Sequence, residues 1–166
     1  MVEAASTITT DKAVRLFEKF GIFTKAELES REEILYENYS KTINIEALTM
    51  IEMSSKQIIP AVVKYTKELA DTVNSVKAAG ADAFVQLGLL KEISSKLAKM
   101  QKALEHLQEV EANAAAMKEG KEQAFYYRET VMSAMEALRI PADELEMLVD
   151  KKVWPFPTYG DLIFEV

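Results

Sequence analysis

The stretch LKEISSKLAKMQKALEHL, residues 90–107, decides the fold of this chain. Its apolar residues recur at alternating spacings of three and four, at Leu90, Ile93, Leu97, Met100, Leu104 and Leu107. A helix with this spacing carries one continuous apolar stripe, which must be buried against other helices. We therefore predict an all-α fold, with this helix beginning near Asp82 and ending at a turn around Gly120.

The segment before this helix reads as a very long helix with a sharp start. In FTKAEL, residues 23–28, Thr24 can cap the backbone amide of Glu27 while the Glu27 side chain reaches back to the amide of Thr24. This capping box predicts a helix that begins at Lys25. Pro60 cannot donate an intrahelical hydrogen bond and crowds the preceding turn. Because the apolar pattern continues beyond it, we expect a kink near Pro60 and no full break.

Two further helices complete the expected bundle. The segment from Asp11 has an apolar stripe between an N-cap at Thr10 and a stop at Gly21, so it predicts a short helix. After Gly120 an apolar stripe runs to Val149 across Pro141, where we expect a second kink. The prediction is an elongated antiparallel helical bundle, made of a short N-terminal helix and three long helices over residues 11–153. Residues 1–10 are expected to be a flexible leader.

One part of the longest helix is apolar nearly all round. Seven of the eleven residues in INIEALTMIEM, residues 43–53, are apolar, and they occupy well over half of the helix circumference. A helix of this kind is covered on more than one side. We expect the second cover to be the short N-terminal helix, the C-terminal tail, or a neighbouring chain or domain.

The chain closes with WPFPTYGDLIFEV, residues 154–166, which we expect to be an extended, docked apolar tail. Pro155 and Pro157 restrict their own backbone and that of the residue before each, so the segment should be stiff. A stiff segment loses little chain entropy when its aromatic side chains are buried. Its groove lies either on this chain or on a partner domain or subunit. The candidate docking residues are Trp154, Phe156, Tyr159 and Phe164 of the tail and Ile43, Leu48, Met50 and Ile51 of the long helix.

Charge and composition exclude several classes of partner. The net charge of −7 disfavours nucleic acids and anionic membrane surfaces, which select basic patches. The sequence has no long apolar run that would span a membrane and no export leader, so we expect a cytoplasmic protein.

The sequence carries no recognisable catalytic, cofactor or metal site. It has no cysteine, and its one histidine, His106, lies beside the apolar stripe on a polar helix face. Its five glycines are scattered and form no phosphate-binding loop. We therefore predict no catalytic, cofactor-binding or metal-binding residue in this chain.

Four segments give a resemblance to a known family. They are LFEKFGIFTKAELESREEILYENYSKTINIEALTMIEM (16–53), IIPAVVKYTKELAD (58–71), YYRETVMSAMEALRIPADELEMLV (126–149) and the tail WPFPTYGDLIFEV (154–166). Together they resemble the C-terminal region of the bacterial type III glutamine synthetases. The similarity weakens only over residues 80–122, where helices of any origin look alike.

The resemblance implies a non-catalytic helical domain of a larger enzyme. The parent would be a glutamate–ammonia ligase that uses ATP and Mg²⁺ or Mn²⁺, whose catalytic motifs lie upstream of this segment in the family. Implied partners are the upstream catalytic domain and neighbouring subunits of a ring-shaped homo-oligomer. The alternative is a freestanding helical adaptor, a coiled-coil interaction module that captures a partner helix.

Overall fold

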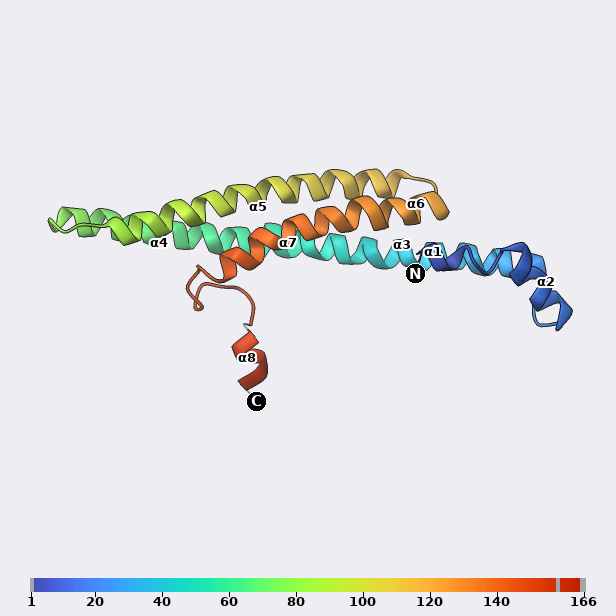
Figure 1. The fold of residues 1–166 in the computed structure, drawn as a ribbon. Helices are drawn as coiled ribbons and strands as arrows, with labels where there is room; N and C mark the ends of the chain where they lie inside the picture. The colour runs from blue at the N-terminus through green and yellow to red at the C-terminus, as the bar shows by residue number, and fades with distance from the viewer. Residues whose placement is uncertain (1, 158, 165–166) are drawn as a thin grey trace. The chain divides into compact units, whose positions relative to one another are not determined.

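The computed structural model describes residues 2–157 and 159–164, with Tyr159 and Gly160 described by their backbone only. It confirms the all-α prediction (Figure 1). Every regular element among these residues is a helix. The elements are α1 (Val2–Ala5), α2 (Asp11–Lys19), α3 (Lys25–Met53), η1 (Ser54–Ile58), α4 (Ile59–Ala78), α5 (Phe84–Ala116), α6 (Lys121–Tyr126), η2 (Tyr127–Val131), α7 (Met132–Glu146) and α8 (Tyr159–Phe164), of which η1 and η2 are π-helical.

The chain divides into two compact units. Unit 1 consists of residues Met1–Thr49 and Gln108–Ala134, and unit 2 of Met50–Leu107 and Met135–Val166. The apolar stripe of α5 contributes to the core of both, with Ile93, Met100, Leu104 and Leu107 buried in unit 2 and Ala114 buried in unit 1. The predicted seam is therefore the interior face of this helix.

The predicted capping box starts α3 in unit 1. The Glu27 carboxylate accepts a hydrogen bond from the Thr24 amide at 2.7 Å, and the Thr24 hydroxyl accepts one from the Glu27 amide at 3.4 Å. Thr10 caps α2 as predicted, accepting from the amide of Ala13. Gly21 follows with a φ of 64°, a left-handed conformation that favours glycine.

The N-terminal residues, which we predicted to be a flexible leader, contain a short helix with buried side chains. Val2 and Ala5 of α1 belong to a core cluster with Tyr36 of α3 and Ala124 of α6. Glu3 pairs with Arg128, and Thr9 donates to Glu32 at 2.6 Å. Two apolar side chains and two polar contacts therefore join this segment to the helices of unit 1.

The turn between α5 and α6 is fastened by a side chain that sequence reasoning did not single out. Gly120 has a φ of 134°, which residues with a side chain rarely adopt. Just beyond it, the buried amide of Gln123 donates to the carbonyl of Ala114 at 3.0 Å. The same carbonyl in the last turn of α5 also accepts from the Met117 amide at 3.2 Å, so the Gln123 side chain adds a second bond that ties α6 to the end of α5.

In unit 2 the long helix passes Pro60 through a π-helical segment. The amide of Ile59 donates to the carbonyl of Ser54, five residues earlier. A π-turn widens the helix, and such widening accommodates a proline that lacks an N–H and crowds the preceding turn. The helical path thus continues across Pro60, as predicted, by one wide turn in place of a break.

A second π-helical segment, η2, lies ahead of Pro141 and was not predicted. It spans Tyr127–Val131, and the amide of Met132 donates to the carbonyl of Tyr127. Pro141 itself lies inside α7, with Leu138 and Leu145 buried on either side of it. The apolar stripe therefore persists through the proline, as expected.

The C-terminal tail is part of unit 2. We predicted that it would be extended throughout, but in the structure only the part before α8 is non-helical. A turn at Asp150 precedes it, where the amides of Val153 and Trp154 donate to the Asp150 carbonyl at 2.8 and 3.0 Å. Residues 154–157 are irregular, but Tyr159–Phe164 form the short helix α8. The proline restriction therefore acts only on the first part of the tail, and the chain becomes helical beyond it.

Among the described residues, the model has no helix with both the length and the apolar content that a transmembrane helix needs.

We predict that replacing Thr24 with alanine destabilises the start of α3 by about 1 kcal/mol, because it removes an N-cap. The cap bonds also lower the pKa of the Glu27 carboxyl, so the folded state favours its ionised form. The stabilisation that the ionised Glu27 carboxylate gives to the folded state is therefore present above its ordinary pKa of 4.5. It is lost as the pH falls through the lowered pKa. Urea unfolding of the wild type and Thr24→Ala at pH 7 and pH 3 should give a smaller difference at pH 3. An equal loss of unfolding free energy at pH 7 and at pH 3 would show that the ionised Glu27 carboxylate does not strengthen the cap.

We predict that Trp154→Ala destabilises unit 2 by about 3 kcal/mol, since it removes a large buried side chain. Thermal unfolding followed by circular dichroism measures the change. Phe164→Ala is the matched control, because this aromatic of the same tail is 82% exposed and its loss should leave the melting temperature unchanged. Equal melting temperatures for wild type and Trp154→Ala would show that the tail does not pack on unit 2.

Candidate functional site

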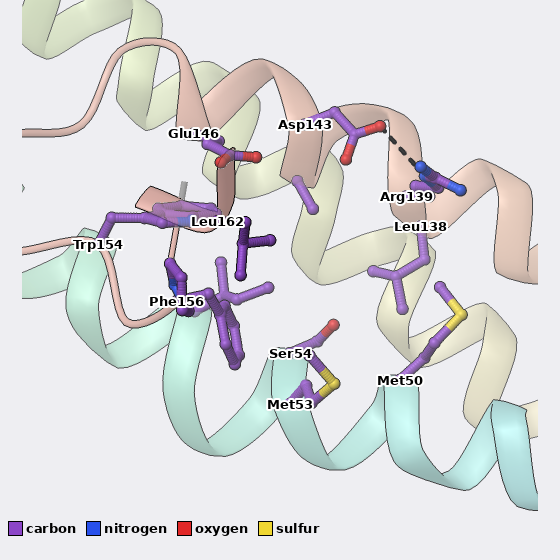
Figure 2. A pocket seen from close by; sticks show the side chains of 13 residues that line it. Met50, Met53, Ser54, Leu138, Arg139, Asp143, Glu146, Trp154, Phe156 and Leu162 are labelled. Atoms are coloured by element: carbon purple, nitrogen blue, oxygen red, sulfur yellow. Dashed lines mark hydrogen bonds and ion pairs between the residues drawn. The ribbon is translucent and has the colours of Figure 1, made fainter. Parts of the chain in front are cut away.

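A groove in unit 2, which we call the tail groove, lies between the C-terminal tail and two helical segments. Met50, Met53, Ser54 and Ile58 line it from α3 and η1, and Leu138 and Ala142 line it from α7. Trp154, Phe156, Pro157 and Leu162 form the side contributed by the tail (Figure 2). The groove encloses about 330 Å³, and its surface is mostly apolar.

The turn at Asp150 sets the position of the tail. Besides the two bonds to its carbonyl, its carboxylate accepts from the amide of Lys152 at 2.7 Å. This turn leads directly to Trp154, whose side chain is buried. Pro155 and Pro157 then limit the backbone on either side of Phe156, which is half-buried. The tail aromatics nearest the turn therefore line the groove.

The polar groups at the groove come from η1 and α7. The Arg139 guanidinium donates to the Asp143 carboxylate at 3.2 Å, and both side chains are well exposed. Glu146, one turn further along α7, also lines the groove. Figure 2 shows the Ser54 oxygen pointing into the groove and Glu146 beside Leu162 and Trp154 at its edge. The groove thus combines an apolar interior with a hydroxyl and carboxylates.

The structure brings together only some of the residues that we predicted for docking. Trp154, Phe156 and Met50 line the tail groove, whereas Phe164 is exposed. The side chain of Tyr159 lies outside what the structure describes.

The remaining docking candidates on the long helix lie outside the lining of the groove. Ile43 is buried in unit 1, Leu48 is exposed, and Ile51 is half-buried. Ile45 of the same apolar stretch is 65% exposed, so the described residues of unit 1 leave this side of the stretch uncovered. Whether these residues bind another domain or subunit stays a prediction.

Sequence reasoning missed the contribution of α7 to the groove. Leu138 belongs to the apolar stripe after Gly120, and Arg139 and Asp143 lie four residues apart, where side chains of one helix can pair. Nothing local indicated that they would face Met50 and Trp154. That placement depends on how α7 packs against η1, which a periodicity in one helix does not contain.

A second surface of interest lies on α2 in unit 1. Its apolar side chains Leu16 and Phe20 are 53% and 65% exposed, and Ile22 just after the helix is 55% exposed. Phe17, on the same helix, instead packs its ring against Phe23, with 5.7 Å between centroids. The guanidinium carbon of Arg31 lies over the Phe23 ring, 4.2 Å from its centroid. We call Leu16, Phe20 and Ile22 the α2 patch.

Metal-binding chemistry finds no support in the described part of the chain. Within residues 2–157 and 159–164, no three His, Asp or Glu side chains lie close enough together to hold a metal ion. His106 is exposed on α5.

Comparison with known proteins shows similarity to one region of glutamine synthetases. Residues 1–77 match the glutamine synthetase C-terminal domain family. A glutamine synthetase of Butyrivibrio fibrisolvens is 43% identical over 95% of this chain, and a type-3 glutamine synthetase of Dictyostelium discoideum is 31% identical over 98%. A glutamine synthetase of Bacteroides fragilis is 29% identical over 95%.

The matched region is a small share of each relative. This chain spans 22–23% of the length of these proteins and aligns with their C-terminal part. The direct family match covers the short N-terminal helices, all of α3 and most of α4, and the pairwise similarity extends over the rest. The chain therefore matches the glutamine synthetase C-terminal domain family over its first 77 residues, and it is similar along nearly its whole length to the C-terminal part of glutamine synthetases.

Proposed function

We propose that this chain is the non-catalytic C-terminal domain of a type III glutamine synthetase, and that its α2 patch packs against the upstream part of the same polypeptide. The parent would be a cytoplasmic glutamate–ammonia ligase. It would use ATP with Mg²⁺ or Mn²⁺ to phosphorylate the glutamate side chain, and ammonia would then displace the phosphate. That chemistry belongs to the upstream region, because the described residues of this chain offer no metal-ligand set.

The exposed α2 patch is the observation that carries this proposal. A short amphipathic helix normally buries its apolar side. In α2 only Val14 is buried, while Leu16 and the C-capping residue Phe20 remain largely in contact with water. Burying such a side chain fully contributes about 1.5–3 kcal/mol. The apolar side of α2 therefore favours an interface.

The relatives support the proposal that the part of the polypeptide before this domain packs against the α2 patch. They are more than four times longer than the aligned region, and this region is C-terminal in them. The patch lies in the first 22 residues of the chain, next to where the longer part of such a polypeptide would join. The exposed side chains of Ile45 and Leu48 on α3 offer a second apolar surface, which we assign to neighbouring subunits of a ring-shaped homo-oligomer.

We predict that Leu16→Asp combined with Phe20→Asp loosens this domain in the full-length enzyme, because two carboxylates would replace the apolar contact. Limited proteolysis should then cut faster at the junction before α2, while the melting temperature of the isolated 166-residue chain should change little. The control is Lys12→Asp with Arg15→Asp, which places two carboxylates at exposed polar positions of α2. It changes the net charge by −4, against −2 for the test pair, so an effect of charge alone would be larger in the control.

Two outcomes would contradict the interface. Equal proteolysis of the wild type and the Leu16/Phe20 variant would show that the patch does not contact the upstream region. An equally large loss of stability in the isolated chain would show that the patch belongs to the core of unit 1.

We predict that the isolated chain has no glutamine synthetase or γ-glutamyl transferase activity with ATP and Mg²⁺ or Mn²⁺ present. A colorimetric γ-glutamyl hydroxamate assay measures this directly, with the full-length enzyme as the positive control. Turnover by the isolated chain above the background of a buffer blank would refute the non-catalytic assignment.

A further inference from the structure

The tail groove has the size and surface of a small-molecule site, which the proposed interdomain role does not require. Ligand sites typically enclose about 300–1,000 Å³ and are mostly apolar, with a few placed polar groups. The tail groove encloses about 330 Å³. Since a water molecule occupies about 30 Å³ of liquid, this space corresponds to roughly ten heavy atoms. It would suit one aromatic or branched aliphatic group with a short arm.

The apolar part of the groove is built from side chains that adapt to a ligand. Met50 and Met53 contribute flexible thioethers, which pack well against aromatic rings. Trp154 and Phe156 contribute aromatic rings from the tail. A planar or branched hydrocarbon body is the chemical group that these residues would bind.

Ser54 supplies an unused polar group in this apolar setting. Its side chain is 4% exposed, and its hydroxyl has no hydrogen-bond partner among the described residues. Its neighbour Ser55, by contrast, donates to the Ile51 carbonyl at 2.7 Å. The Ser54 hydroxyl is not one of the buried side-chain atoms that lack a partner in the described part of the chain, so it stays open to the groove, where water or a ligand can bond it. Ser54 is also the first residue of η1, and π-helical turns are frequent at functional sites.

The charges at the groove favour a cation. Arg139 is already paired with Asp143, which leaves Glu146 as the lining carboxylate with no ion pair or hydrogen bond among the described residues. Its charge is therefore not neutralised within unit 2 as described. A ligand that places an ammonium group beside Glu146 would form a charge-assisted hydrogen bond there.

From the volume, the apolar lining, the Ser54 hydroxyl and the Glu146 carboxylate together, we infer that the tail groove binds a small hydrophobic amine. The ligand has an aromatic or branched body of about ten heavy atoms and one ammonium group. Its body lies between the methionines and Trp154, and its ammonium group lies at Glu146. Because the tail forms one side of the groove, the bound ligand holds the tail against η1 and α7.

The chain carries a built-in reporter for this test. Trp154 is its only tryptophan, and it lines the groove. We would titrate the 166-residue chain with 2-phenylethylammonium and follow Trp154 fluorescence. The neutral probe 2-phenylethanol and the anionic probe 3-phenylpropionate have similar bodies but different head groups. The amine should bind at least tenfold more tightly than the acid, with the alcohol in between.

Glu146→Gln is the decisive variant, because it keeps the shape of the side chain and removes the charge. It should weaken binding of the amine about tenfold and leave binding of the alcohol unchanged. Glu136→Gln is the matched control on the same helix, as Glu136 is exposed and does not line the groove. Thermal unfolding of each variant verifies that unit 2 is folded, and the amine should raise the melting temperature of the wild type.

Three results would overturn the inference. Equal affinities for the amine, the alcohol and the acid would show a nonspecific apolar surface. Equal losses of amine affinity in Glu146→Gln and Glu136→Gln would show that the charge of Glu146 does not contribute to binding. No fluorescence or melting change with any probe up to millimolar concentration would show that the groove takes no small molecule, whatever the outcome for the α2 patch.

Discussion

The continuous apolar stripe of α5 is the constraint on which the rest of the structure depends. Ile93, Met100 and Leu107 are fully buried on one side of a helix whose charged side chains lie on its other sides. A helix with such a stripe must acquire partners, and the short turns at Gly80 and Gly120 bring the neighbouring helices back alongside it. In unit 2, α4 and α5 lie antiparallel and side by side (Figure 1).

The prolines and the π-helical segments connect this packing to the candidate site. Pro60 would have ended a regular helix, but the wide turn of η1 lets the long helix continue. The same turn contains Ser54 and Ile58, which both line the tail groove. The local adjustment to a proline thus shapes the surface on which the tail packs. A straight α-helix at this position would present a different set of side chains to Trp154.

The two candidate surfaces differ in how each is made. The α2 patch is apolar because one short helix leaves its own hydrophobic side chains uncovered. The tail groove forms only when η1, α7 and the tail are assembled, and it carries polar groups that a plain packing surface does not need. The first is suited to a large, rigid partner such as an adjoining domain. The second is suited to a small ligand, which a concave site of limited volume can enclose.

The sequence by itself determined the helices, because their signals are local. The Thr24–Glu27 capping box, the stop at Gly21 and the alternating spacing from Leu90 to Leu107 each depend on residues within one or two turns of one another. The early tail aromatics Trp154 and Phe156 were also recognisable as docking residues, since stiff apolar segments rarely remain in water. The helix α8 was not, because its six residues are too few to show a helical periodicity and the prolines before it indicated an extended segment.

Only the tertiary structure decided which side chains meet. Ser54 and Glu146 are 92 positions apart, and no periodicity in either helix links them. Their shared groove depends on the angle and register at which α7 packs on η1, which many weak contacts set together. The same holds for α2, whose apolar side was clear from the sequence but whose exposure was not. Local hydrogen bonding and spacing therefore fixed the elements of this protein, and long-range packing alone fixed its candidate site.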